Sequence, residues 1–411
     1  MSKKNIAFFL IFIILVLFIL QEIRITTIDD LAYVVAIGLD TGENDLLKVS
    51  FQIANTSGSG SSSGGSSANS EQTSNSTIHT VETSSIDNAI NLINTYLSKQ
   101  LSLAHCKAIV ISEELAAGGI SNYIYTLINK MEISPKCNII ISRVESDYFL
   151  QKASTSMETS STKYYQIIPT TKDFTGFTDT ITLRDFFSRM GDTFAQPYTI
   201  LGSVNTGNNN NSMVSLDEDS SATKAGESII ESPNSIEISG IAVFNADTMV
   251  GQLNSIETIC HLILSNKLEN STISIPSPFS DTETIDLSIS LRKNSDLDVE
   301  LVNGSPFVKA DVFIDARILT MTKDSDYLNS KNLSEIENYA NSYLETQINN
   351  YFYKTSKIFK SDILGLGKYV VSDFVTWHEW VEFDWLNQYE NAFFVVNVET
   401  DVKSGYLLLE T

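Results

Sequence analysis

Side chains that could do chemistry are most concentrated in the segment TWHEWVEFDW near the C-terminus. Its adjacent His378 and Glu379 are residue types that bind metal ions or transfer protons. The HExxH spacing that would place a second histidine on the same helical face is absent from the sequence. We therefore interpret the two residues as an exposed polar pair. The three tryptophans of the segment are expected to pack against the last strand rather than to line a ligand pocket.

Other patterns typical of enzymes are weak. His105 stands beside Cys106, but a catalytic cysteine and its histidine are normally distant in sequence, so we expect His105 to be packed or hydrogen-bonded. The segment GLGKYV, starting at Gly365, has a Gly-x-Gly without the preceding strand and third glycine of a dinucleotide site. There is no GxSxG elbow between a strand and a helix, and P-loop and CxxC motifs are absent. The sequence thus predicts no enzyme, no cofactor and no metal site, and Cys106, Cys137 and Cys260 are expected to be buried thiols.

The charge balance excludes some partners. The chain carries 50 acidic and 27 basic side chains, for a formal charge of -23. Such a charge repels nucleic acid and anionic lipid surfaces. An acidic stretch, DEDSSATKAGE, lacks the spacing of a calcium-binding EF-hand loop and is interpreted as a solvated linker. Over 411 residues, 42% hydrophobic side chains are ample for a globular core.

The N-terminus carries an apolar run, Ile6 to Leu20, preceded by Lys3 and Lys4. A signal peptide ends in small residues at its cleavage site, and this run instead continues into Gln21 and Glu22. We therefore expect a retained membrane anchor over residues 1–22, of a length at the low end of the range for a bilayer. The lysines predict that the N-terminus is cytoplasmic and that the rest of the chain is extracytoplasmic.

The elements after the anchor predict an α+β (mixed α/β) fold with several domains, in which mixed sheets are flanked by helices. The order β-β-α-β-α-β is indicated for residues 23–204, with a Ser/Gly-rich loop at 56–77 that cannot bury apolar area. A capping box is expected at Ser84, at the start of a helix. A polar linker is predicted at 205–234, and a second α+β domain at 235–411. In that domain, Asn332 is expected to cap a long amphipathic helix.

Four ordered segments resemble the C-subunit family of bacterial spore germinant receptors, written Ger(x)C. They are DDLAYVVAIGLDTG (29–42), LSLAHCKAIVISEELAAGGI (101–120), SGIAVFNADTMVGQL (239–253) and DILGLG (362–367), and two tryptophans and a final strand follow them. The resemblance covers nearly the whole expected ectodomain. The candidate interaction positions that these segments and their flanks carry are His105, Lys107, Glu113, Gly240, Glu257, Asp362, Gly365, Gly367, Trp377 and Trp380.

The resemblance implies a three-domain mixed α/β protein on the outer face of the spore inner membrane. It would act there with membrane-embedded A and B subunits in the detection of nutrients that end dormancy. Members of the family are typically lipoproteins, with a cysteine shortly before the mature chain, whereas this sequence has Ile23 to Ile28 at that place. The departure agrees with a retained helix. The family brings no catalytic residues.

Two other classes of function stay open. A freestanding, membrane-tethered nutrient-binding protein would need one concave pocket with convergent polar groups. An envelope hydrolase would need a nucleophile and a base that the sequence does not place. The first is the main alternative to a receptor subunit.

Overall fold

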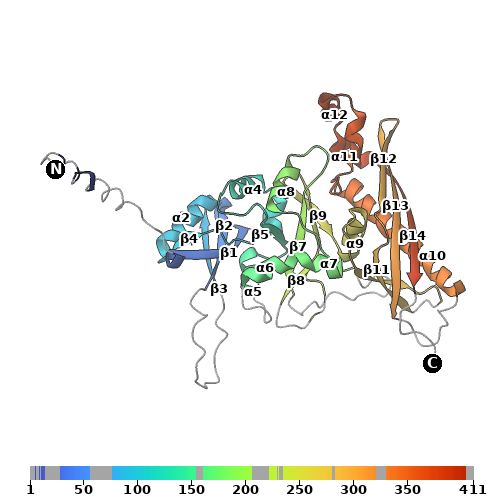
Figure 1. The fold of residues 1–411 in the computed structure, drawn as a ribbon, viewed down its shortest axis with the longest axis horizontal. Helices are drawn as coiled ribbons and strands as arrows, with labels where there is room; N and C mark the ends of the chain where they lie inside the picture. The colour runs from blue at the N-terminus through green and yellow to red at the C-terminus, as the bar shows by residue number, and fades with distance from the viewer. Residues whose placement is uncertain are drawn as a thin grey trace, which may run out of the picture.

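The computed structural model describes residues 5, 9, 11–13, 28–55, 76–153, 161–205, 222–228, 230, 235–279, 283–320 and 330–403. The strands of these residues form one sheet of nine strands and one of five, and helices flank both (Figure 1). This arrangement confirms the predicted mixed α/β architecture. Among the described residues no helix is both long and apolar enough to cross a bilayer, and most of the anchor expected at residues 1–22 lies outside them.

The nine-stranded sheet has the order β3-β2-β1-β5-β6-β7-β8-β9, and the short β4 pairs with β1. Strands β1, β5, β6 and β7 run parallel, while β2, β3, β8 and β9 add antiparallel edges. The bounds are β1 Leu31–Thr41, β2 Leu47–Ala54, β3 Ser76–Thr83, β4 Gln100–Ser102, β5 Ala108–Ser112, β6 Asn138–Ser142, β7 Tyr198–Val204, β8 Ile236–Asn245 and β9 Thr248–Leu253.

The central strands are apolar at most positions because both faces of the sheet are covered. Val110 and Ile140 lie in one buried cluster with Phe149 of α5, whereas Ile109 and Ile139 lie in the other. This alternation follows the two-residue period of a strand. The helices of this part are α2 Ile86–Tyr96, α3 Glu113–Ala117, α4 Ser121–Ile128, α5 Ser146–Lys152, α6 Ser161–Ile167, α7 Lys172–Thr175 and α8 Leu183–Met190.

The five-stranded sheet has the order β10-β11-β13-β12, and β14 pairs with the long β13 in parallel. Helix α9 lies between the two sheets, where nine of its ten residues are buried, as expected of a helix that is apolar on all sides. The bounds are α9 Ser255–Leu264, β10 Ser271–Pro276, β11 Thr284–Leu291, β12 Asp296–Val302, β13 Ser305–Thr320, α10 Ser330–Tyr353, α11 Gly367–Val370, α12 Trp377–Phe383, α13 Trp385–Gln388 and β14 Phe393–Lys403.

Several local expectations need correction. The cap of α2 is Ser85 rather than Ser84, because it is the hydroxyl of Ser85 that accepts from the amide of Asn88. Asn332 lies inside α10, which already begins at Ser330. Strands β3 and β10 were not expected from the sequence, since each has only two apolar side chains apart from a proline at the end of β10, too few for a strong strand signal.

The segment 205–234 lies between β7 and β8, and these two strands pair within one sheet. The first sheet therefore continues past the expected linker as far as β9. The division into domains at that segment stays a prediction.

Side chains of α10 cover the amides of the edge strand β14. The side-chain oxygens of Glu345, Asn341 and Glu337 accept from the backbone amides of Val398, Thr400 and Val402 at 3.1, 2.8 and 3.1 Å. Four residues of a helix advance about 6 Å and two residues of a strand about 6.6 Å, so the two series stay in step. Occupied amides of this kind prevent the edge from pairing with another chain.

We expect Asn341→Ala to lower the free energy of unfolding by about 1–2 kcal/mol, because the amide of Thr400 loses its acceptor in a partly buried place. Hydrogen exchange of that amide should become faster. Asn349→Ala is the matched control, since the side chain of Asn349 donates to the carbonyl of Glu345 in its own helix. Equal urea midpoints for the two variants would contradict the role given to Asn341.

Candidate functional site: a buried polar junction and the helical tip

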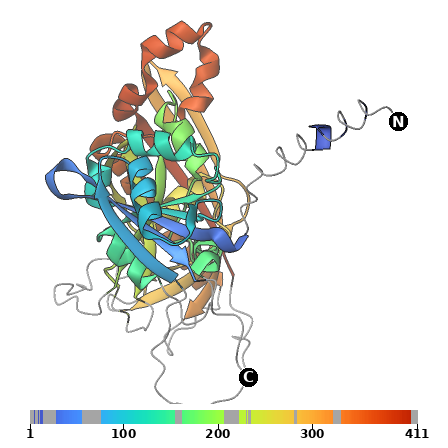
Figure 2. The ribbon, with the colours of Figure 1, turned by 90° about the vertical axis from the view of Figure 1, so that its left-hand side faces the viewer.

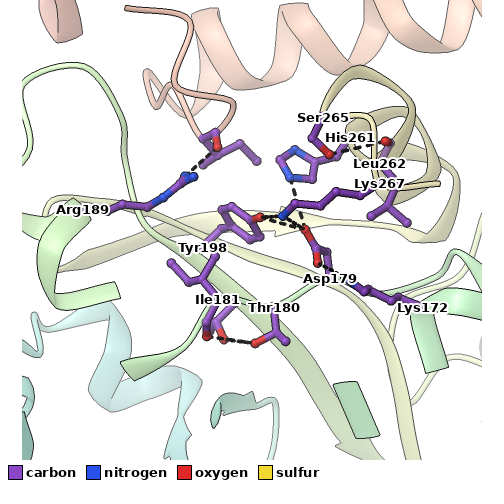
Figure 3. Close-up of polar contacts among 12 residues, drawn as sticks. Lys172, Asp179, Thr180, Ile181, Arg189, Tyr198, His261, Leu262, Ser265 and Lys267 are labelled. Carbon is purple, nitrogen blue, oxygen red and sulfur yellow. Dashed lines mark hydrogen bonds and ion pairs between the residues drawn. The ribbon is translucent and has the colours of Figure 1, made fainter. Parts of the chain in front are cut away.

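Polar side chains gather where the two sheets meet, and all of them except a half-exposed lysine are buried (Figure 3). The carboxylate of Asp179 accepts from Lys267 Nζ and from the hydroxyl of Tyr198, both at 2.8 Å. His261 Nε2 lies 3.7 Å from the same Asp179 oxygen, and its Nδ1 lies 2.9 Å from the hydroxyl of Tyr351. We call Asp179, Tyr198, His261, Lys267 and Tyr351 the junction cluster.

The junction cluster joins elements that are far apart in sequence. Asp179 precedes α8, Tyr198 begins β7, and both belong to the first sheet region. His261 lies on α9, Lys267 follows that helix, and Tyr351 comes from α10. A displacement of one region against the other would separate these charges inside the protein, which is strongly unfavourable.

The protonation states follow from burial and from the neighbouring charges. Burial lowers the pKa of His261 to about 3, so the ring is neutral at pH 7. Burial alone would raise the pKa of Asp179, but Lys267 and other partners hold it below its usual value. If the hydroxyl of Tyr351 donates to Nδ1, the remaining ring proton is on Nε2 and faces Asp179. Asp179 and Lys267 therefore neutralise each other, and His261 adds no charge at pH 7.

Asp362 forms a second buried polar centre next to the junction cluster. Its carboxylate accepts from the amides of Gly365 and Gly367 at 2.8 and 3.2 Å and from Trp385 Nε1 at 2.9 Å. Burial raises its pKa to about 6, although these donors oppose that shift. We call this arrangement the Asp362 cradle.

The backbone of the Asp362 cradle requires both glycines. Gly365 has φ of +72°, in the left-handed region that favours glycine. A Cβ at Gly367 would lie 2.7 Å from atoms of Phe194 and Trp385. Arg189 connects the cradle to the junction cluster, since its guanidinium donates to the carbonyl of Ile363 at 2.8 Å and lies over the ring of Tyr198.

The tryptophans divide into two kinds. Trp380 and Trp385 are 1% exposed, and a row of rings continues from them through Tyr389 to Phe394 on β14. Trp377 is 61% exposed, so the expectation that it packs against the last strand is wrong. On the same helix His378 is exposed and lies 3.3 Å from Glu382, as expected of a polar surface residue.

The other candidate positions are spread over the molecule rather than gathered at one site. His105 is exposed and makes an edge contact with the ring of Tyr33, and the backbone of Lys107 bonds β1 and Asn138. Glu113 accepts from Gln252 of β9 at 2.5 Å.

Gly240 and Glu257 both have structural roles around α9. Gly240 has φ of +93°, and a Cβ there would lie 2.4 Å from the carbonyl oxygen of Leu253. Glu257 completes a capping box with Asn254 and forms an ion pair of 2.7 Å with Lys354. Of the candidate positions, Asp362, Gly365 and Gly367 are hydrogen-bonded in one site. Trp385, which was not a candidate, also donates to Asp362.

Sequence reasoning missed the junction cluster. Asp179, Tyr198 and Lys267 lie in no motif, and His261 looked like part of an apolar helix, since it sits in the run TICHLIL. A histidine inside such a run predicts a buried polar partner, and this was the only available signal. Nothing in the sequence identified which partner it would be.

A small cavity of about 250 Å³ lies at the carboxyl ends of β1, β5 and β6. Its lining includes Asp40, Glu113, Glu114, Arg143 and Glu145. Asp40 is buried and bonded to Ser146, and burial raises its pKa. Strands β2 and β3 lie on one side of β1, and β5 to β7 on the other, so the cavity is at the switch point where open α/β sheets bind ligands.

Comparison with known proteins gives two matches to protein families. Residues 25–203 match a model described as spore germination protein N-terminal domain, and residues 239–405 match one described as spore germination B3/GerAC like, C-terminal. Among solved structures, the fold is similar to one described as the crystal structure of the GerBC protein, with a TM-score of 0.51 and 12% identity over 89% of this chain and 96% of that chain. No curated protein matches.

We expect His261→Phe to flatten the acid dependence of stability. The imidazole has its ordinary pKa of about 6.5 when unfolded and about 3 when folded, so the unfolded chain binds more protons between these values. The free energy of unfolding therefore falls as the pH drops through this window, by about 3 kcal/mol from pH 7 to pH 4. Phenylalanine should avoid that part of the loss, although the hydroxyl of Tyr351 loses its partner.

Urea unfolding at pH 7 and pH 4 measures the difference. His105→Phe is the control, because His105 lies at the surface, and it should lose as much stability as the natural chain. The interpretation fails if His261→Phe shows the same loss between the two pH values as the natural chain.

We expect Gly367→Ala to lower the free energy of unfolding by about 1–3 kcal/mol, because the added Cβ has to displace Phe194 or Trp385. Exchange of the Trp385 indole proton, which is bonded to Asp362, should become faster. At Gly191 a Cβ meets nothing within 4 Å, so Gly191→Ala should leave both measurements unchanged. The same urea midpoint for the two variants would argue against a tightly packed cradle.

Proposed function

Because the chain belongs to the GerAC-like family of spore germination proteins, we propose that it is the non-enzymatic C subunit of a nutrient germinant receptor. In this role it acts with membrane-embedded A and B subunits to trigger germination. The observation that carries the proposal is the succession of two family matches, which together extend over most of the chain. The similarity to the GerBC structure over nearly its full length supports the fold on which this role depends.

The interior of the molecule is consistent with a scaffold. Asp179 and Lys267 pair with each other, and His261 is neutral and buried against Tyr351. These contacts connect the first sheet region to α9 and α10. A rigid connection of this kind lets one surface of the subunit hold a fixed orientation relative to another while partners bind.

The proposal includes attachment to the spore inner membrane through the N-terminal apolar segment. The two lysines before that segment favour an extracytoplasmic position for the rest of the chain. A tether raises the effective concentration of the protein beside membrane partners, so a weak interface is enough for assembly. The net charge of -23 disfavours adsorption of the folded part to anionic lipid, which leaves the apolar segment as the attachment.

One observation favours a second candidate, a membrane-tethered nutrient-binding protein that works alone. The cavity at the carboxyl ends of β1, β5 and β6 has the position expected of a ligand site in an open α/β sheet. Its carboxylates and Arg143 could in principle hold the two charged groups of an amino acid. Arg143 is already held by Glu227 and by the carbonyl of Ala225, however, so a ligand would have to displace these contacts.

We expect the tagged full-length chain, purified in mild detergent from spore inner membrane, to bring with it two polytopic membrane proteins in a fixed ratio. Mass spectrometry identifies them, and an equally tagged single-span membrane protein of the same spores serves as the control. Recovery of this chain alone would contradict the subunit role. Saturable binding of an amino acid or sugar by that isolated chain would then support the second candidate.

A further inference from the structure

Helix α12 leaves large apolar side chains in solvent. Val375, just before the helix, is 90% exposed, and Trp377 and Val381 are 61% and 48% exposed. Trp377 and Val381 are four residues apart, so they lie on one face of the helix. We call these three residues the tip surface, because α12 lies above the ends of the strands in Figure 1, and in Figure 2 the red helices of the C-terminal region again extend beyond the strands.

The neighbouring position 380 of α12 is firmly held. Trp380 is buried against Phe374 and Phe383, and its indole donates to the hydroxyl of Thr193 at 2.9 Å. Thr376 caps the helix by accepting from the amide of Glu379. The exposure of Trp377 is therefore a property of an anchored helix and does not come from a loosely attached segment.

The Asp362 cradle fixes the position of this helix relative to the rest of the molecule. Asp362 bonds the indole of Trp385, and Trp385 stacks on Trp380. Burial makes the ionised form of Asp362 unfavourable, and it therefore raises the pKa of this carboxyl group. Because the cradle holds α12 in one position, the exposed side chains of the helix lose little conformational entropy when they bind a partner.

The charges around the tip surface indicate the kind of partner. Asp373, Glu379, Glu382 and Asp384 surround it in sequence, and residues 373–384 contain no lysine or arginine. Glu379 and Glu382 are on the same exposed helix. An acidic rim repels an anionic bilayer surface and complements a basic one. An exposed tryptophan at the centre of such a rim is typical of a protein interface, where tryptophan contributes much of the binding energy.

We propose that the tip surface docks into an apolar pocket rimmed by lysine and arginine on the extracytoplasmic side of the membrane subunits. This inference rests on the proposed function and names the surface of this chain that contacts its partner. Trp377 enters the pocket, Val375 and Val381 cover its edge, and Glu382 faces a basic side chain of the rim.

The test places a photo-activatable phenylalanine derivative at position 377 of the full-length chain in spores. The same group at Met131, which is fully exposed on the loop after α4, is the matched control. Illumination should link position 377, and not position 131, to one of the two polytopic proteins that co-purify with the chain. Glu382→Lys should reduce this product about tenfold, whereas Glu269→Lys, at another exposed carboxylate, should leave it unchanged.

The outcomes separate this inference from the proposed function. Products with lipid alone, or no more product at 377 than at 131, would overturn the docking surface if the two membrane proteins still co-purify. A product that Glu382→Lys leaves intact would overturn the basic rim. If the membrane proteins do not co-purify with the natural chain at all, the proposed function and this inference both fail.

Discussion

The buried carboxylate of Asp179 is the constraint on which the arrangement of the two sheets depends. Its side chain is inaccessible to solvent, and its stability as an anion requires Lys267, which arrives from beyond α9. Removal of a buried charge from its partner costs several kcal/mol, more than most single apolar contacts contribute. The junction cluster therefore selects one arrangement of the two sheets. A purely apolar interface could shift by one residue, whereas such a shift would separate Asp179 from Lys267.

The Asp362 cradle extends the same principle to the helical tip. The carboxylate of Asp362 is held by two backbone amides and an indole. Apolar contacts alone would let the short helices α11, α12 and α13 pack in several ways. Directional bonds to a single buried group select one of them. The glycines at 365 and 367 are required because the chain has to curve closely around that group.

The sequence predicted the elements better than it predicted their long-range contacts. The apolar runs of β1, β5 and β6 and the period of α10 identify strands and a helix because burial imposes those patterns locally. By contrast, the pairing of His261 with Tyr351 joins residues 90 positions apart, and no local pattern encodes it. Trp377 shows a related limit: its neighbour Trp380 has the same side chain, and only the direction of α12 in the fold decides which of the two is buried.

Arg189 and Gln196 connect the junction cluster to the Asp362 cradle. Arg189 contacts Tyr198 of the junction and the carbonyl of Ile363 beside the cradle, and the amide of Gln196 donates to the carbonyl of Asp362. A displacement of the tip therefore has to move β7 or break buried bonds. Coupling between distant surfaces needs such a continuous set of contacts with few alternative arrangements. In this fold the path from α12 to the first sheet is short, because Trp380 Nε1 donates to the hydroxyl of Thr193, which lies just before β7.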